Sequence, residues 1–298
     1  MIDKRGRIAS TERLRTVLLG LFFNILSCIL VRADCPPDVL GTSRILPVGT
    51  IGGGAVGLKT YPQTLKLQNY EVVLTFDDGP LPATTAAILH ALAKECVKAT
   101  FFLSGRNAAA APALVRQEID DGHTVGHHTM THPSLTLRNL SDLRARDEIE
   151  SGMEADDRAG YGIAESEPKV PFFRFPGFAD TKPLIEWLAR RNIVVFGADL
   201  WASDWLPMGP TEELDLLMHR LDQTKKGIIL LHDTKRQTAE MVPALLHELK
   251  NRGYHIVHIV PAPGRLESIA APPNWSSETE RTLLHMWPRA LPIEIQHN

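Results

Sequence analysis

The chain contains little cysteine, no surplus of basic charge and a single long apolar run. Its 32 Lys and Arg residues stand against 35 Asp and Glu residues, a formal net charge of −3, which gives no indication of a nucleic-acid partner. Three cysteines allow no more than one disulfide. The apolar run, residues 17–31, is shorter than the roughly 20 residues that span a bilayer. The whole chain has 298 residues, 44% of them hydrophobic, which is enough for one domain of about 200–250 residues with tails.

The N-terminus has the features of a targeting segment. Basic residues dominate its first 15 positions, the apolar run follows, and Val31-Arg32-Ala33 offers small residues at the usual cleavage spacing. We therefore expect residues 1–33 to be a secretory signal peptide and the protein to be secreted or periplasmic. An uncleaved membrane anchor is the alternative. Cys28 would leave with the signal peptide, and the sequence does not decide whether Cys35 and Cys96 pair.

Proline and glycine are dense in residues 34–66, and prolines recur in residues 263–298. We expect irregular extensions there, on either side of one domain at residues 67–262. Within this domain, apolar and β-branched runs alternate with helical patterns. The expected strands are Val72–Phe76, Thr100–Leu103, His123–Gly126, Phe172–Phe175, Ile193–Phe196, Ile228–Leu231 and Ile256–Val260. The expected helices are Ala83–Glu95, Pro112–Asp120, Ser141–Arg158, Lys182–Arg191, Glu212–Asp222 and Ala239–Arg252.

Strands that alternate with helices predict a parallel sheet. About seven such units suggest a barrel one unit short of the eight-fold one, and an open doubly wound sheet is the alternative. In barrels of this kind the active site lies at the carboxyl ends of the strands. Polar residues lie in or after five of the expected strands, near their carboxyl ends: Asp77, Asp78, His128, His132, Arg174, Asp199, Asp204 and His232.

The first strand ends in two adjacent carboxylates, Asp77 and Asp78. Such a pair repels itself and needs a cation or a shared proton. Gly79-Pro80 ends the strand sharply and holds both carboxylates near the sheet edge. A solvated turn is the alternative, because Asp-Gly and Gly-Pro are common turn pairs.

His128 and His132 stand four residues apart, a spacing that places both imidazoles on one side of a helical turn. With Asp78 as a third ligand they form a two-histidine, one-carboxylate set with an open position, which is a hydrolytic zinc arrangement. The same ligands also suit non-haem iron. His232 closes a buried strand, where it is either a general acid or a core histidine.

These residues and their neighbours form five short motifs along the chain. The motifs are Thr75–Pro80, His128–Pro133, Arg174-Phe175-Pro176, Asp204-Trp205 and Leu230-Leu231-His232. Over residues 70–260 the chain resembles the NodB homology domain of carbohydrate esterase family four, the polysaccharide deacetylases. The resemblance implies an α/β fold, a distorted (β/α)7 barrel.

The resemblance also implies a role for each matched residue. Asp78, His128 and His132 correspond to the metal ligands, Asp77 to the base that deprotonates the metal-bound water, and His232 to the acid that protonates the leaving amine.

The supporting residues follow in the same way. Arg174 corresponds to the partner that orients the catalytic Asp, and Asp204 to the carboxylate that tunes the catalytic His. Trp205 and Leu230 correspond to walls of the acetyl pocket. Gly177 supplies the backbone N–H that faces the oxyanion, although the family often has an aromatic residue there.

The implied function is metal-dependent removal of acetyl groups from glycans that contain N-acetylglucosamine, either chitooligosaccharide or peptidoglycan-like. The implied cofactor is Zn²⁺, or Co²⁺ or Ni²⁺ in its place. The implied partner is the acetylated polysaccharide or oligosaccharide substrate, and no protein partner is predicted. Removal of O-acetyl groups from xylan is a variant within the family. A glycan-binding barrel without turnover and a hydrolase of another amide are the rival classes.

A few other residues have open interpretations. Asp199 is a candidate for a further acidic residue of the fourth motif, at an unusual spacing, and Trp201 either stacks on sugars or packs in the core. We expect His127 to point away from the metal, and His123 to be structural or to support a ligand, with a role as a ligand itself as the alternative. Gly52–Gly57 matches a dinucleotide-binding pattern, but no clean strand precedes it and Pro62 stops a helix.

Overall fold

The computed structural model describes residues 35–133 and 137–286. The predicted signal peptide and the last twelve residues of the expected C-terminal extension lie outside this part of the chain. Within it, no helix combines the length and apolar character that crossing a membrane requires.

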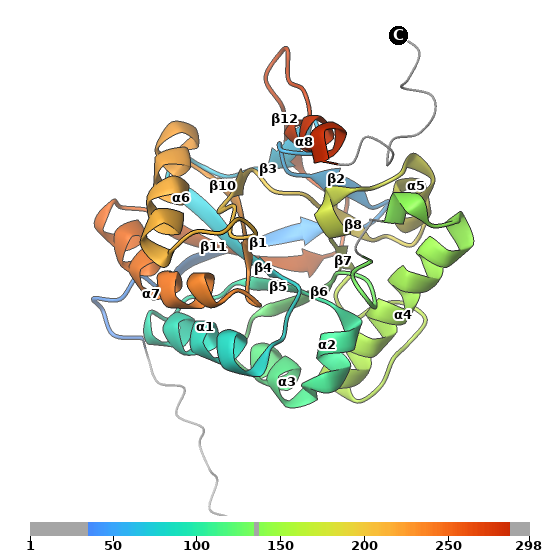
Figure 1. The fold of residues 1–298 in the computed structure, drawn as a ribbon, viewed down its shortest axis with the longest axis horizontal. Coiled ribbons are helices and arrows are strands. Elements are labelled where there is room, and N and C mark those ends of the chain that lie inside the picture. The colour runs from blue at the N-terminus through green and yellow to red at the C-terminus, as the bar shows by residue number, and fades with distance from the viewer. Residues whose placement is uncertain (1–34, 134–136, 287–298) are drawn as a thin grey trace, which may run out of the picture. The chain divides into compact units, whose positions relative to one another are not determined.

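Seven parallel strands surround the core of the fold (Figure 1). They are β4 (Glu71–Asp77), β5 (Thr100–Leu103), β6 (Thr124–His127), β7 (Phe172–Phe173), β8 (Val194–Phe196), β9 (Leu200–Trp201) and β10 (Gly227–His232). β4 pairs with β5, and pairing continues through β6 and β7 to β8. On its other side β4 pairs with β10, and β10 pairs with β9. Six of the seven expected strands are among these seven paired strands. The other one, β9, was not predicted, because two residues are too few to show a pattern of alternation.

Most of the helices lie outside the strands (Figure 1). They are α1 (Pro82–Lys94), α2 (Gly105–Ala110), α3 (Pro112–Asp120), α4 (Asp142–Tyr161), α5 (Lys182–Arg190), α6 (Pro210–Thr224), α7 (Arg236–Asn251) and α8 (Glu278–Met286). All six expected helices are present, and local signals fix their ends. Ser141 and Thr181 cap the starts of α4 and α5 with side-chain oxygens, and Gly162 ends α4 in the left-handed conformation.

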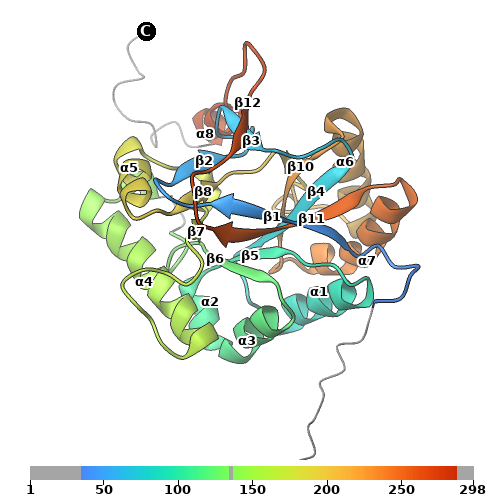
Figure 2. The same ribbon diagram turned by 180° about the vertical axis from the view of Figure 1, so that it is seen from behind.

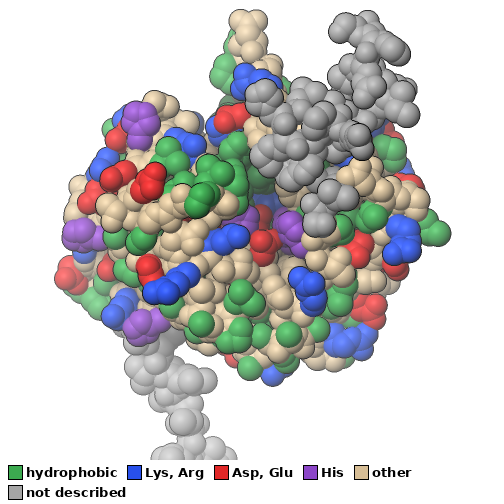
Figure 3. Space-filling view, viewed as in Figure 1, with side chains coloured by type: hydrophobic (Ala, Val, Ile, Leu, Met, Phe, Trp, Pro, Cys, Tyr) green, Lys and Arg blue, Asp and Glu red, His purple; other side chains and the backbone are tan. Residues whose placement is uncertain are grey.

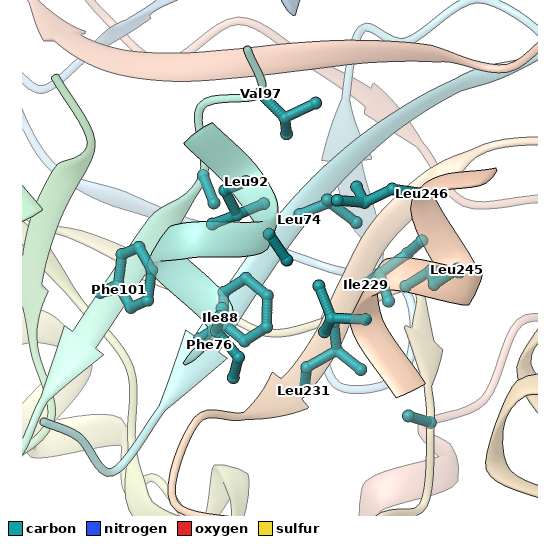
Figure 4. Packing of buried hydrophobic residues seen from close by; sticks show 14 of the residues in the cluster. Leu74, Phe76, Ile88, Leu92, Val97, Phe101, Ile229, Leu231, Leu245 and Leu246 are labelled. Carbon is teal, nitrogen blue, oxygen red and sulfur yellow. The ribbon is translucent and has the colours of Figure 1, made fainter. Parts of the chain in front are cut away.

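Two apolar layers hold the strands in place. Outward-facing residues of β4, β5 and β10, such as Leu74, pack against residues of α1 and α7, such as Ile88 and Leu245 (Figure 4). A second cluster, which includes Phe102 and Phe196, lies on the opposite face of the same strands. Burial on both faces explains why these strands read as continuous apolar runs in the sequence.

The segment before the predicted domain is more regular than we expected. It contains β1 (Thr42–Gly49), β2 (Gly54–Val56) and β3 (Gln63–Leu65). β1 pairs in parallel with β11 (His255–Ala262), the seventh expected strand, as seen from behind in Figure 2. β3 pairs with β12 (Ser268–Ala270), which lies in the C-terminal extension. The expectation of irregular extensions was therefore wrong for these residues, because their hydrogen-bond partners are distant strands that a local pattern does not reveal.

The series of paired strands is interrupted between β8 and β9, and the N-terminal segment fills the gap. β2 pairs with the free edge of β8. Asp199 then accepts hydrogen bonds from Leu58 N and Ile228 N, both at 2.8 Å, and from Thr64 Oγ1 at 2.8 Å. Gly57 has a φ of +118°, and a Cβ there would lie 2.5 Å from Ala198 N. Asp199 thus serves as a structural tie across the gap.

A disulfide joins Cys35 to Cys96, the residue two positions beyond α1. Nearby, Leu40 N and Gly41 N donate to the side chain and backbone oxygen of Glu95. The start of the described chain is therefore held to the end of α1, which settles the pairing that the sequence left open.

Candidate active site

Eight of the ten predicted site residues line one cavity of about 290 Å³. They are Asp77, Asp78, His128, His132, Gly177, Trp205, Leu230 and His232. Figure 3 shows histidine and acidic side chains gathered in a hollow near the centre of this face. The other two, Arg174 and Asp204, are fully buried beside it. The volume is at the lower end of the range for small-molecule sites.

Asp78, His128 and His132 converge on one point. Asp78 Oδ1 lies 3.5 Å from Nε2 of His128 and 3.4 Å from Nε2 of His132. Two ligand atoms about 2.1 Å from the same ion, at a tetrahedral angle, lie about 3.4 Å apart. The observed separations therefore fit a single tetrahedral ion such as zinc.

The hydrogen bonds of these side chains support a cation at this point. Nδ1 of His128 lies 2.7 Å from the carbonyl oxygen of Arg174, which can only accept, so Nδ1 carries the proton. Burial lowers the pKa of His128 to about 4, so its Nε2 presents a lone pair. That lone pair faces Asp78 Oδ1, a buried oxygen that accepts no hydrogen bond from the described residues. Two electron-rich atoms in contact repel each other, and a divalent cation between them removes the repulsion.

The two histidines reach this point differently from our expectation. We expected a helical turn, but residues 128–133 form a loop after β6. Thr129 and His132 adopt positive φ values of 71° and 49°. Backbone bonds from Gly105 N and Arg106 N to the carbonyls of Thr129 and Met130 hold the loop, each at 2.9 Å. The four-residue spacing brings the imidazoles together because the loop folds back, and not because it is helical.

Asp77 is oriented by Arg174. The guanidinium donates from Nη1 to Asp77 Oδ1 at 2.6 Å and to Thr75 Oγ1 at 2.8 Å. Its Nη2 and Nε donate to the carbonyls of Gly197 and Phe196. Burial lowers the pKa of Arg174, while the Asp77 carboxylate opposes that effect. The four hydrogen bonds fix the position of the guanidinium. Because the guanidinium engages Oδ1 of Asp77, Oδ2 is the oxygen left available to the cavity.

His232 is held by Asp204. Nδ1 of His232 lies 2.7 Å from Asp204 Oδ1, and the backbone N–H of His232 donates to Asp204 Oδ2 at 2.7 Å. Burial alone lowers the pKa of His232, but the charge and hydrogen bond of Asp204 outweigh it, with help from Asp78 and Asp77, and raise the pKa to about 10. His232 is consequently a protonated imidazolium at neutral pH, with Nε2 as its remaining donor.

The remaining predicted residues shape the cavity. Gly177 has a φ of 59°, and its N–H makes no hydrogen bond with another described residue. The Trp205 ring, 38% exposed, meets the His232 ring edge-on with centroids 6.1 Å apart. Leu230 packs with Phe178 and Trp201. Trp201 also lines the cavity.

Sequence reasoning missed the contribution of α8. Thr279, Thr282 and Leu283 of this helix line the cavity. The helix is fixed to the N-terminal segment by Thr279, whose N–H donates to the carbonyl of Lys59 at 2.9 Å. Its Glu280 accepts from Arg138 Nη2 at 2.5 Å. Only the partly apolar pattern of residues 278–286 hinted at a helix, and nothing local indicated that it borders the site.

The two remaining histidines near the metal motif do not enter the cavity. His127 Nδ1 lies 2.8 Å from Asp156 Oδ2, and both side chains are buried. His123 Nδ1 accepts from the backbone N–H of Ala99 at 3.1 Å. Both placements agree with the expectation that neither is a ligand.

Comparison with known proteins identifies the class. The family model described as polysaccharide deacetylase matches residues 66–192. A peptidoglycan-N-acetylglucosamine deacetylase of Bacillus cereus is 34% identical over 210 residues, which are 66% of this chain and 72% of that protein. The chain belongs to the polysaccharide deacetylase family.

Two further relatives show how much of a related protein this chain covers. The peptidoglycan-N-acetylglucosamine deacetylase PgdA of Listeria monocytogenes is 30% identical over 193 residues, 64% of this chain and 38% of its own length. The chain thus spans well under half of that relative. The structure of a Bdellovibrio bacteriovorus peptidoglycan deacetylase superposes with a TM-score of 0.66 at 28% identity, covering 78% of this chain and 62% of the other.

Proposed function

We propose that this protein is a metal-dependent hydrolase that removes acetyl groups from glycans containing N-acetylglucosamine. The observation that carries the proposal is the convergence of Asp78, His128 and His132 in one cavity with the Asp77–Arg174 and His232–Asp204 pairs. The Bacillus cereus relative is named for action on peptidoglycan N-acetylglucosamine, which makes a peptidoglycan-like glycan the first substrate to test.

Asp78, His128 and His132 would hold the metal. When bound there, a Zn²⁺ ion lowers the pKa of water and polarises the acetamide carbonyl. Co²⁺ and Ni²⁺ suit the same nitrogen and oxygen ligands.

The protein's own groups then divide the proton transfers. Asp77 takes the proton of the attacking water on Oδ2, because Arg174 engages Oδ1. The N–H of Gly177 donates to the oxygen of the tetrahedral intermediate. His232 gives the proton on Nε2 to the departing amine, while Asp204 holds Nδ1. Trp205 and Leu230 flank the space left for the acetyl methyl group.

The test measures acetate release from a panel of substrates. The panel contains peptidoglycan fragments, N-acetylated chitooligosaccharides and acetylated xylan, and each is assayed on protein of known metal content. We expect release from the N-acetylated substrates, loss on chelation and recovery when zinc is returned. Binding of the glycans without acetate release in the zinc-loaded protein would instead identify a binding module.

We also propose that the protein is exported. The Cys35–Cys96 disulfide supports this, because disulfides form and persist in oxidising compartments. Fractionation of cells that express the full chain is the test, and we expect the protein outside the cytoplasm. Recovery in the cytoplasm with both thiols reduced would contradict export.

A further inference from the structure

A buried chain of hydrogen bonds continues behind the His232–Asp204 pair. The hydroxyl of Thr238, in the first turn of α7, lies 2.9 Å from Asp204 Oδ2. The same hydroxyl lies 3.0 Å from Oε1 of Glu213, in α6. All three side chains are fully buried, and the second Glu213 oxygen, Oε2, has no partner among the described residues.

The number of protons in this series of hydrogen bonds decides which groups donate and which accept. A hydroxyl carries one proton and can donate to only one of two carboxyl oxygens. Asp204 already accepts from the ring and the backbone N–H of His232, as expected of a charged carboxylate. Thr238 therefore donates to Asp204. The contact of Thr238 with Glu213 is favourable only when Glu213 brings a proton of its own and donates it to the hydroxyl.

We propose that Glu213 is a positioning residue of the catalytic acid: in its protonated form it donates to Thr238, which donates to Asp204 and fixes that carboxylate against His232. The inference rests on the proposed function, since it concerns the acid of that reaction.

The electrostatics of the site agree with a proton on Glu213. Burial, and after it the charge of Asp204, raise the pKa of Glu213 to about 7, against the opposing effects of Thr238 and His232. Below this value Glu213 is neutral and donates. As the pH rises through it, the proton is lost, and two carboxylates compete for the Thr238 hydroxyl. The added negative charge also strengthens the hold of His232 on its proton, so donation to the leaving amine becomes slower.

Three variants and a matched control test this in the zinc-loaded protein. Glu213→Gln keeps an N–H donor at every pH, Glu213→Ala removes it, and Thr238→Val removes the hydroxyl with little change of shape. Glu212→Gln is the control, because Glu212 precedes Glu213 on α6 and is exposed. The readouts are kcat and KM against pH for an N-acetylated oligosaccharide, and the NMR signal of the His232 Nδ1 proton.

The expected results separate a positioning role from a merely structural one. Wild-type protein and Glu212→Gln show a fall in kcat with an inflection near pH 7 and a matching shift of the Nδ1 signal. Glu213→Gln loses both inflections and retains more kcat than Glu213→Ala. Thr238→Val lowers kcat about tenfold with KM unchanged, which corresponds to ~1.4 kcal/mol of barrier.

Two results would overturn the inference: the wild-type inflection persisting in Glu213→Gln, or Thr238→Val behaving as the control does. A wild-type protein that releases no acetate from any glycan would contradict the proposed function instead. In that case the NMR signal of the His232 Nδ1 proton still tests the role of Glu213, because the measurement requires no turnover.

Discussion

The carbonyl oxygen of Arg174 accepts a hydrogen bond from His128, while the guanidinium of the same residue donates to Asp77. One residue therefore sets both the tautomer of a candidate metal ligand and the direction of the candidate base. The coupling arises because Arg174 directly follows the short strand β7, next to β6 in the sheet. The backbone of Arg174 faces the loop that begins at His128, and its side chain crosses to the end of β4.

Asp77→Asn tests the base. The amide has nearly the shape of the carboxylate but cannot accept the proton of water, so we expect zinc to remain bound while kcat falls by about 10²–10⁴. Acetate release measured together with zinc content is the check. Turnover equal to that of the wild-type protein would exclude Asp77 as the base.

His128→Ala tests the metal site. Removal of one of three protein ligands leaves Asp78 and His132, which is too few for a stable site. We expect the purified variant to contain little zinc by elemental analysis and to be inactive. His127→Gln is a suitable comparison, because His127 bonds to Asp156 outside the cavity; it should keep its zinc. A full zinc complement in His128→Ala would refute the ligand assignment.

Asp199→Ala tests the tie between the N-terminal segment and the strands. The substitution leaves the buried N–H groups of Leu58 and Ile228 without their acceptor. Each such loss costs about 1–3 kcal/mol, so we expect the free energy of unfolding to fall by ~3 kcal/mol in a urea titration. The exposed Asp120 provides the control substitution, Asp120→Ala, which should change the stability little. Equal stability of the two variants would argue against the tie.

Thr282→Trp tests whether α8 borders the substrate. Thr282 is partly exposed and lines the cavity, and its hydroxyl makes no hydrogen bond with another described residue. A bulky ring there narrows the cavity, so we expect KM for N-acetylated oligosaccharides to rise about tenfold, equivalent to ~1.4 kcal/mol of binding, with unchanged zinc content. Arg281→Trp places the same ring at a neighbouring exposed position and should leave KM unchanged. The same KM in both variants would place the substrate away from α8.

The interior strands and the site residues were predictable from the sequence because their signals are local. β5 and α3 have the bounds that we expected, since a buried apolar run, or an amphipathic pattern that begins at a proline, is complete within a few residues. Asp77, His128 and His232 were found because each follows such a strand, and parallel strands all end at one edge. The helical turn at His128 was wrong because a four-residue spacing is equally compatible with a loop of positive φ values.

By itself, then, the sequence determined the order of strands and helices, and with it the set of polar side chains that meets at the carboxyl ends of the strands. Only the tertiary structure decided how the gap between β8 and β9 is filled, that α8 borders the cavity, that Cys35 pairs with Cys96, and that Glu213 stands behind Asp204. The physical reason is distance along the chain. These contacts join segments far apart in the sequence, such as Lys59 and Thr279, and their hydrogen bonds and packing leave no periodic trace in either segment alone.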